Sequence, residues 1–354
     1  MIKSLFSKSA WILALSRGGN YFFAGGCLYS KSDRVTQEIR ETFGKPIADL
    51  GGKAFRRVSL ASLFMSKRTQ RVDAVLIAGV GRLGNSVVQI INVVNLARFV
   101  GANKVFYHLF TAIDNRNLRI ADDISLEKIS VFGRRSHPPE IIWRTYAVSG
   151  PEPLYSPFDA STTPARAALS KAVFDHITPV ETSPTTLTIH LRSGDIFGPN
   201  PHPSYGQPPW AYYLRVLTSQ PWSEVRLVAE DSNNPCHAGV LSWCQEMGIT
   251  VIKAGQSIES SLAEISSAHN LVTGIGTFCP AIVYLSMRPI RVYVFGAEIP
   301  ALLRDSRTEV YGSVDSSGSY TREILSGNWS NSTEQRELMM AYPSTALQGP
   351  ERAS

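Results

Sequence analysis

Cysteine is scarce in this chain of 354 residues, which contains four: Cys27, Cys236, Cys244 and Cys279. No two of them form a CxxC pair, so the sequence gives no indication of a zinc knuckle. A chain of this length can bury a core without disulfides. Cys236 and Cys244 could form a bridge, but we expect two reduced thiols on one helix.

Long apolar runs are also missing, since none approaches the ~18–20 residues that a transmembrane helix needs. Near the start, the apolar stretch from Ala10 to Leu15 is shorter than the core of a signal peptide, and Arg17 closes it. We therefore expect a cytoplasmic protein. Asn328-Trp-Ser and Asn331-Ser-Thr match the N-glycosylation pattern, which also arises often by chance.

Neither low complexity nor a strong charge bias is present. Hydrophobic residues make up 44% of the chain and charged residues 18%, which excludes wholesale disorder, collagen and a coiled coil. The net charge of +6 suits an anionic substrate or a membrane surface and does not require nucleic acid, so no nucleic-acid partner is expected. Residues 51–72 have no acidic side chain. We favour a solvated helix face there, with contact to anionic lipid or to a sugar-nucleotide as the alternative.

The length predicts two domains. In the first half, Asp73–Ala78 reads as a buried strand, and a glycine-rich turn leads into an apolar helix over Ser86–Val100. Lys104–Phe110 reads as the next strand, which completes a parallel β-α-β unit. A further helix is expected at 164–176, before a linker rich in Pro and Thr.

The second half alternates strands and helices more clearly. Strands are predicted at Thr186–Leu191, Val225–Ala229, Thr250–Lys253, Asn270–Thr273 and Arg291–Phe295. Helices are predicted at Trp210–Thr218, Cys236–Glu246, Ile258–Ser267 and Phe278–Ser286. This alternation is typical of a doubly wound parallel sheet, and two such units would face each other across a cleft. The expected division is an accessory segment (1–72), two Rossmann-like domains (73–182 and 183–325) and a loose tail (326–354).

Gly79-Val-Gly-Arg-Leu-Gly84 follows a strand and opens a helix, as the dinucleotide fingerprint GxGxxG does. The acidic residue expected ~20 positions later is absent, because Gly101–His108 contains no carboxylate and Asp114 comes too late. A tight turn that needs glycine for packing explains the motif equally well.

Three further motifs follow predicted strands, at the sheet edge where ligands of open α/β folds bind. In His190-Leu-Arg192-Ser-Gly-Asp195, Arg192 could hold phosphate oxygens and Asp195 could orient it or accept a proton; a structural Arg–Asp pair is the alternative. Glu230 and Asp231 could hold ribose hydroxyls or begin a helix. Gly274-Ile-Gly-Thr-Phe278 offers an anion site at a helix start or an ordinary N-cap.

Taken together and in this order, the motifs resemble the fucosyltransferase superfamily of α-1,2, α-1,6 and protein O-fucosyltransferases. The resemblance spans about 73–295 and includes Gly81-Arg-Leu-Gly84-Asn85, His190–Asp195, the pair Tyr212-Tyr213, Glu230-Asp231 and Ser261–Phe278. The chain departs from the family at Ser193, which replaces a second arginine, at Ser86, which replaces a glutamine, and at Gly276-Thr-Phe-Cys-Pro. These departures leave the donor sugar open.

The resemblance implies a GT-B fold and an inverting, metal-independent glycosyltransferase that moves fucose from GDP-fucose to a glycan hydroxyl. It implies that Arg192 and the segment Gly276, Thr277 and Phe278 face the β-phosphate. His190, Glu230 and Asp231 would hold the base and ribose, and Gly84 and Asn85 would contact donor or acceptor from the other domain. Asp195 is the candidate base. No resident cofactor is expected; the partners are a nucleotide-sugar and a glycan.

Two other functions remain open at the level of sequence. One is an NAD-dependent oxidoreductase built on Gly79–Gly84. The other is a non-catalytic protein that binds nucleotides or glycans, in which Ser193 marks lost activity. The segment Pro201–Trp210 could cover a sugar or could be a loop stiffened by its prolines.

Overall fold

The computed structural model describes residues 12–15, 21–24, 27–30, 74–77, 83–100, 104–107, 118–121, 124–128, 145–148 and 163–352. The chain divides into two compact units, Met1–Val173 and Phe174–Ser354. The basic segment at 51–72 and the glycines at 79 and 81 lie outside the described residues.

The C-terminal unit contains a sheet of seven strands in the order β11-β10-β9-β12-β13-β14-β15. The strands are β9 Thr186–Leu191, β10 Glu224–Ala229, β11 Thr250–Ala254, β12 Asn270–Val272, β13 Ile290–Phe295, β14 Thr308–Asp315 and β15 Leu347–Arg352. All neighbours are parallel except β14 and β15, which are antiparallel. The strand order reverses beside β9, so this sheet has a topological switch point between β9 and β12.

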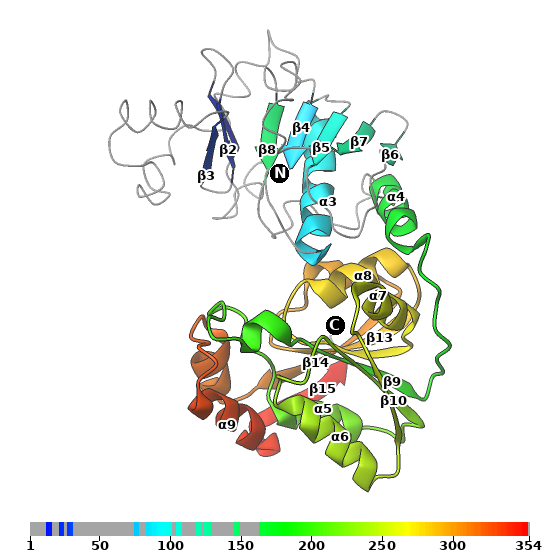
Figure 1. Ribbon diagram of the computed structural model, residues 1–354, viewed down its shortest axis with the longest axis vertical. Coiled ribbons are helices and arrows are strands. Elements are labelled where there is room, and N and C mark those ends of the chain that lie inside the picture. Colours follow the sequence, from blue (N-terminus) through cyan, green and yellow to red (C-terminus); the bar gives the residue numbers. More distant parts are fainter. Residues whose placement is uncertain are drawn as a thin grey trace. The chain divides into compact units, whose positions relative to one another are not determined.

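Helices cover both faces of this sheet (Figure 1). Helices α5 Trp210–Leu217 and α6 Cys236–Glu246 lie on one face, and α7 Ile258–Ser267 and α8 Phe278–Ser286 lie on the other. The predicted α/β class is confirmed, and the predicted bounds of β9, α6, α7 and α8 agree with those observed.

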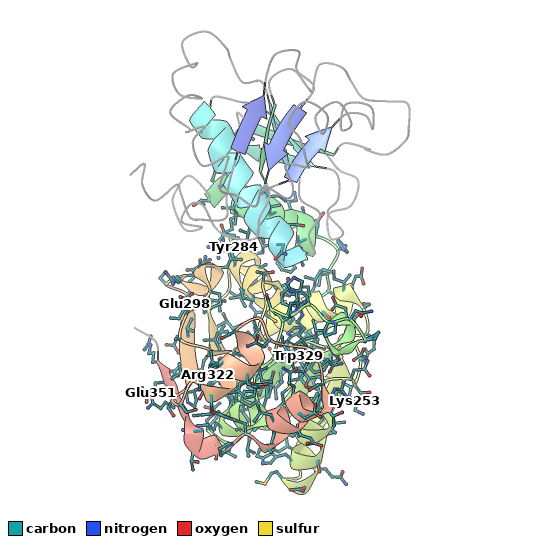
Figure 2. All side chains as sticks on the ribbon, turned by 90° about the vertical axis from the view of Figure 1, so that its left-hand side faces the viewer. Lys253, Tyr284, Glu298, Arg322, Trp329 and Glu351 are labelled. Atoms are coloured by element: carbon teal, nitrogen blue, oxygen red, sulfur yellow. The ribbon has the colours of Figure 1, made fainter. Side chains whose placement is uncertain are left out.

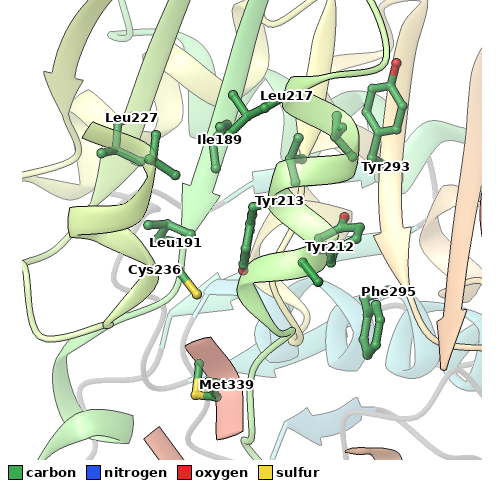
Figure 3. Close-up of a cluster of buried hydrophobic side chains, with 14 of the residues drawn as sticks. Ile189, Leu191, Tyr212, Tyr213, Leu217, Leu227, Cys236, Tyr293, Phe295 and Met339 are labelled. Atoms are coloured by element: carbon green, nitrogen blue, oxygen red, sulfur yellow. The ribbon is translucent and has the colours of Figure 1, made fainter. Parts of the chain in front are cut away.

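Successive side chains along β9 point to opposite faces of the sheet, so every second residue packs against the same helices. Leu187, Ile189 and Leu191 belong to the apolar cluster between the sheet and helices α5 and α6 (Figure 3). Tyr212 and Tyr213 on α5 are fully buried in this cluster, so the tyrosine pair is part of the core. Burying an apolar side chain such as Ile189 in this cluster stabilises the fold by roughly 1.5–3 kcal/mol.

The N-terminal unit contains a sheet in the order β6-β7-β5-β4-β8. Its strands are β4 Ala74–Ile77, β5 Lys104–Tyr107, β6 Leu118–Ala121, β7 Ile124–Lys128 and β8 Thr145–Val148. Helix α3, Leu83–Val100, connects the parallel strands β4 and β5, which confirms the predicted β-α-β unit. The helix begins three residues before the predicted Ser86 because the apolar pattern already starts at Leu83, which is buried. Helix α4 spans Thr163–Phe174.

The predicted accessory segment contains strands β1 Ile12–Leu15, β2 Tyr21–Ala24 and β3 Cys27–Ser30, which pair as an antiparallel sheet. Among the described residues, no helix has both the length and the apolar character needed to cross a membrane. Cys236, Cys244 and Cys279 are free and buried, so the expectation of two reduced thiols on one helix is confirmed for α6.

The expectation of a loose tail at 326–354 is wrong. This stretch forms helix α9, Thr333–Ala341, and strand β15, which pairs with β14. Trp329 is 1% exposed and donates from Nε1 to the Ile196 carbonyl at 2.7 Å; Figure 2 shows it inside the C-terminal unit. The composition misleads because most polar residues of the segment lie outside, apart from the buried Gln335, while large side chains such as Trp329 and Met339 belong to the core.

Candidate functional site

Three loops converge at the carboxyl edge of the C-terminal sheet. Strand β9 lies between β10 and β12 and is parallel to both, so the residues that follow the three strands meet at one edge. The loops contain Arg192 after β9, Glu230 after β10 and the turn Gly274–Thr277 after β12. The predicted motifs of the C-terminal half are therefore brought together at the switch point.

Arg192 lies between an aromatic ring and a glycine. Its guanidinium carbon is 4.0 Å from the centroid of the Tyr205 ring, a cation–π distance. A Cβ on Gly276 would lie 2.9 Å from Nη1 of Arg192, and the φ angle of Gly276 is +142°. Both the space and the backbone conformation therefore call for glycine at this position, and the turn approaches the guanidinium as the sequence predicted.

Helix α8 begins at Phe278, directly after this turn. Thr277 is its N-cap residue but makes no capping hydrogen bond with its side chain. The first turn of a helix presents backbone N–H groups and the positive end of the helix dipole, which favours a bound anion. The anion-binding features of Arg192 and of α8 therefore lie at the same edge.

His190 lies on β9, on the face opposite the cluster around α5. Its ring centroid is 5.6 Å from that of Phe278, and its Nδ1 is buried without a hydrogen-bond partner within the described part of the chain. Burial, together with the charge of Arg192, lowers the pKa of His190 to about 4. The imidazole is therefore neutral at pH 7, and the positive charge at this edge comes from Arg192.

Asp231 binds its neighbours on the protein. It accepts hydrogen bonds from the Ser193 hydroxyl and from the backbone N and Nδ2 of Asn233, both at 2.8 Å. Burial raises the pKa of Asp231, but the bonds from Ser193, Asn233 and the Gly194 backbone outweigh it and hold the pKa below its usual value. Asp231 is therefore an ionised group that joins the loops after β9 and β10.

Asn234 adds to this link between the two loops. It is fully buried, donates from Nδ2 to the Arg192 carbonyl at 3.0 Å, and donates its backbone N–H to the Ser193 hydroxyl at 3.2 Å. Ser193, the departure from the family pattern, thus bonds both Asp231 and Asn234. The backbone that carries Arg192 is anchored by these contacts.

Glu230 differs from Asp231 because its side chain is exposed. A Cβ on Gly194 would lie 2.7 Å from the Glu230 carboxyl carbon, and the φ of +65° at Gly194 is a conformation that favours glycine. Asp195 lies in the short 3₁₀ turn Gly194–Phe197 and is also exposed. These two carboxylates lie at the surface beside the Arg192 loop.

Gly84 and Asn85 lie in the first turn of α3, in the N-terminal unit. Gly84 is buried and Asn85 is half-buried. The site described above consists of residues of the C-terminal unit, and the predicted contribution of these two residues to it stays a prediction.

Three residues of the site were missed as site residues at the level of sequence: Tyr205, Gln207 and Asn234. They include Tyr205 of the segment Pro201–Trp210, which lies against Arg192, while a role of that segment as a cover for a sugar stays a prediction. Its unusual content of His, Pro and Tyr was the one available signal. Among the described residues, no three side chains of His, Cys, Asp or Glu are grouped closely enough to hold a metal ion.

No protein-family model and no curated protein matches the chain. Among solved structures, the fucosyltransferase NodZ from Bradyrhizobium is similar at 11% identity and a TM-score of 0.35, over 61% of this chain and 94% of that one. The E. coli heptosyltransferase WaaC, solved with ADP-2-deoxy-2-fluoro heptose, is similar at 11% identity and a TM-score of 0.35, over 74% and 98%. POFUT1 in complex with GDP is similar at 10% identity and a TM-score of 0.34, over 62% and 95%.

A second structure of NodZ, an α-1,6-fucosyltransferase co-crystallised with GDP, is similar at 11% identity and a TM-score of 0.36, over 61% of this chain and 93% of that one.

Proposed function

We propose that this chain is a glycosyltransferase that moves a sugar from a nucleoside diphosphate to a hydroxyl group of a glycan. The observation that carries the proposal is the position of Arg192 at the switch point, against the Gly274–Gly276 turn and at the same edge as the start of α8. A fixed cation and a helix N-terminus at one sheet edge suit a pyrophosphate.

In the proposed reaction, the acceptor oxygen forms a bond to the anomeric carbon while the bond from that carbon to the phosphate oxygen breaks. Negative charge grows on the leaving β-phosphate, and Arg192 and the N-terminus of α8 stabilise it without a metal ion. Removing one such donor costs about 3–4 kcal/mol, or roughly 10²–10³-fold in rate.

The exposed carboxylates have separate proposed roles. Asp195 accepts the proton that the acceptor hydroxyl loses. Glu230 binds ribose hydroxyls, a role that Asp231 fills less well because its oxygens already accept hydrogen bonds from Ser193 and Asn233. The neutral His190 contacts the nucleotide near Phe278. We propose GDP-fucose as the donor on the resemblance of the motifs alone.

The first prediction concerns Arg192. GDP should raise the melting temperature of the wild-type protein, and Arg192→Ala should abolish that rise. Without ligand, the melting temperature of Arg192→Ala should stay almost unchanged, because the substitution removes a half-buried guanidinium and leaves the hydrophobic core intact. Thermal-shift measurements with GDP, UDP, ADP and NAD provide the test.

The same measurements separate the other candidate functions. Stabilisation by NAD alone would favour the oxidoreductase and contradict our proposal. Stabilisation by GDP without hydrolysis of GDP-fucose or transfer to any glycan would favour the non-catalytic binding protein. Activity that persists with EDTA would support the metal-independent reaction.

A further inference from the structure

Gln207 makes a set of contacts that no sequence motif indicated. The side chain is completely buried. Its Nε2 donates to the carbonyl oxygens of Tyr205 at 3.0 Å, Gly206 at 3.1 Å and Ile275 at 3.3 Å, and its Oε1 accepts from the Ile275 backbone N–H at 3.0 Å. One amide group therefore joins the loop before α5 to the turn before α8.

These two loops are the ones that contact the Arg192 guanidinium. Tyr205 lies over the guanidinium from the first loop, and Gly276 approaches Nη1 from the second. Each contact lies within two residues of an atom that Gln207 binds, since Gln207 binds the Tyr205 carbonyl and both backbone polar groups of Ile275. The amide thus links the backbone of the residue that carries the ring to the residue directly before the glycine.

The loop that carries Tyr205 is also held from its far side. The hydroxyl of the buried Tyr320 donates to the Gln207 carbonyl at 2.6 Å. A Cβ on Gly206 would lie 2.9 Å from the backbone carbonyl carbon of Ile324, so the two backbones pack closely. The loop is therefore fixed on one side by residues 320–324 and on the other by the turn at Ile275.

We propose that Gln207 is a positioning residue that fixes the orientation of the Arg192 guanidinium toward its anionic ligand. The identity of that ligand as a nucleoside diphosphate rests on the proposed function. An arginine side chain has many rotamers, and restricting them before binding removes an entropic cost from the binding step. Losing Gln207 should therefore weaken diphosphate binding although Gln207 itself is buried beside the site.

The test compares two buried glutamines. Gln207→Met keeps the length of the side chain and removes its hydrogen bonds. Gln335→Met is the matched control, because Gln335 is also buried, donates to two carbonyls and accepts from Ser330, yet has no bond to either loop that contacts Arg192. Both changes should lower the melting temperature. Only Gln207→Met should raise the Kd for GDP, by roughly ten-fold or more, as expected for the loss of a buried polar network.

A second measurement does not depend on the nucleotide. The rate at which phenylglyoxal modifies Arg192, followed by mass spectrometry, should rise in Gln207→Met and stay unchanged in Gln335→Met. If the wild type fails to bind GDP but Arg192 reacts faster in Gln207→Met, the proposed function fails and the positioning role stands. If both the Kd and the modification rate are unchanged in Gln207→Met, the positioning role is wrong.

The single variants of Tyr205 supply a test that does not require the Gln207 variant to fold. Tyr205→Leu removes the ring from Arg192, whereas Tyr205→Phe keeps it and serves as the control. We expect faster modification of Arg192 in Tyr205→Leu alone. In the double variant with Gln207→Met the two effects on modification should be less than additive, because both act on the same side chain. An unchanged rate in Tyr205→Leu, or additive effects, would overturn the proposal.

Discussion

At the scale of single residues, the site depends on backbone conformations that only glycine adopts easily. Gly276 has a φ of +142° beside the Arg192 guanidinium, and Gly194 has a φ of +65° beside the Glu230 carboxyl group. Ser193 shows how a departure from a family motif is accommodated, since its hydroxyl joins Asp231 to Asn234. Gly276, Gly194 and Ser193 therefore allow the polar side chains of Arg192, Glu230 and Asp231 to lie close to the neighbouring backbone.

Gly276→Ala tests the importance of this close approach. The new methyl group would lie 2.9 Å from Nη1 of Arg192, on a backbone that is strained for alanine. The guanidinium has to move, and we expect GDP binding to weaken by about ten-fold or more while stability falls by roughly 1–3 kcal/mol.

Calorimetric titration with GDP and urea unfolding would measure the two effects. Gly318→Ala is the control, because Gly318 also has a positive φ but no heavy atom lies within 4 Å of its added Cβ. Equal loss of GDP affinity in both variants would speak against a role for the turn.

At the scale of elements, the alternation of apolar strands with helices was sufficient to predict most of the C-terminal sheet. Strands β9 to β13 were expected close to where they lie, because each is an apolar run that ends in turn residues. Strand β14 was missed because its burial shows no alternation of period two, and β15 because it contains Gly349, Pro350 and charged residues.

The candidate site was predictable in part for the same reason. Arg192 follows β9 directly and Gly276 lies in the turn after β12, so the rule for ligands at strand ends located both. Gln207 and Asn234 act through hydrogen bonds to loops 68 and 42 positions away in the sequence, and no local pattern reports such partners. Hydrogen bonds between loops that are distant in the sequence are therefore the part of the site that could not be predicted from the sequence.

Trp329 provides a prediction for the segment first expected to be loose. Its ring packs against Phe197 at 5.4 Å between centroids, and its N–H bonds the Ile196 carbonyl. Trp329→Ala should therefore destabilise the C-terminal unit by about 3–5 kcal/mol, whereas Trp329→Phe should cost less because a ring is retained.

Chemical denaturation of both variants measures the difference. Ordinary surface substitutions change the free energy of unfolding by less than about 0.5 kcal/mol. A change that small in Trp329→Ala would mean that the segment contributes nothing to the hydrophobic core.

At the scale of the whole molecule, the depressed pKa of His190 links folding to pH. The unfolded chain binds a proton at His190 near pH 6.5, and the folded chain does so only near pH 4. Between these values the unfolded state carries more protons, so stability falls as the pH drops from 6.5 to 4. This single group accounts for at most about 3 kcal/mol, since the side chain is only half-buried.

His190→Gln should reduce that dependence. The difference in unfolding free energy between pH 7 and pH 4.5 should be smaller in the variant than in the wild type, as measured by urea unfolding at both values. An identical pH dependence in the two proteins would show that His190 titrates normally in the folded state.

Strand β15 has a consequence for how molecules of this protein meet in solution. It forms the outer strand at one end of the seven-stranded sheet and is joined antiparallel to β14. Its outward backbone is a poor template for another strand, because Pro350 has no N–H to donate and Glu351 and Arg352 are charged and exposed. The stretch expected to be a loose tail thus protects this end of the sheet from growing into aggregates.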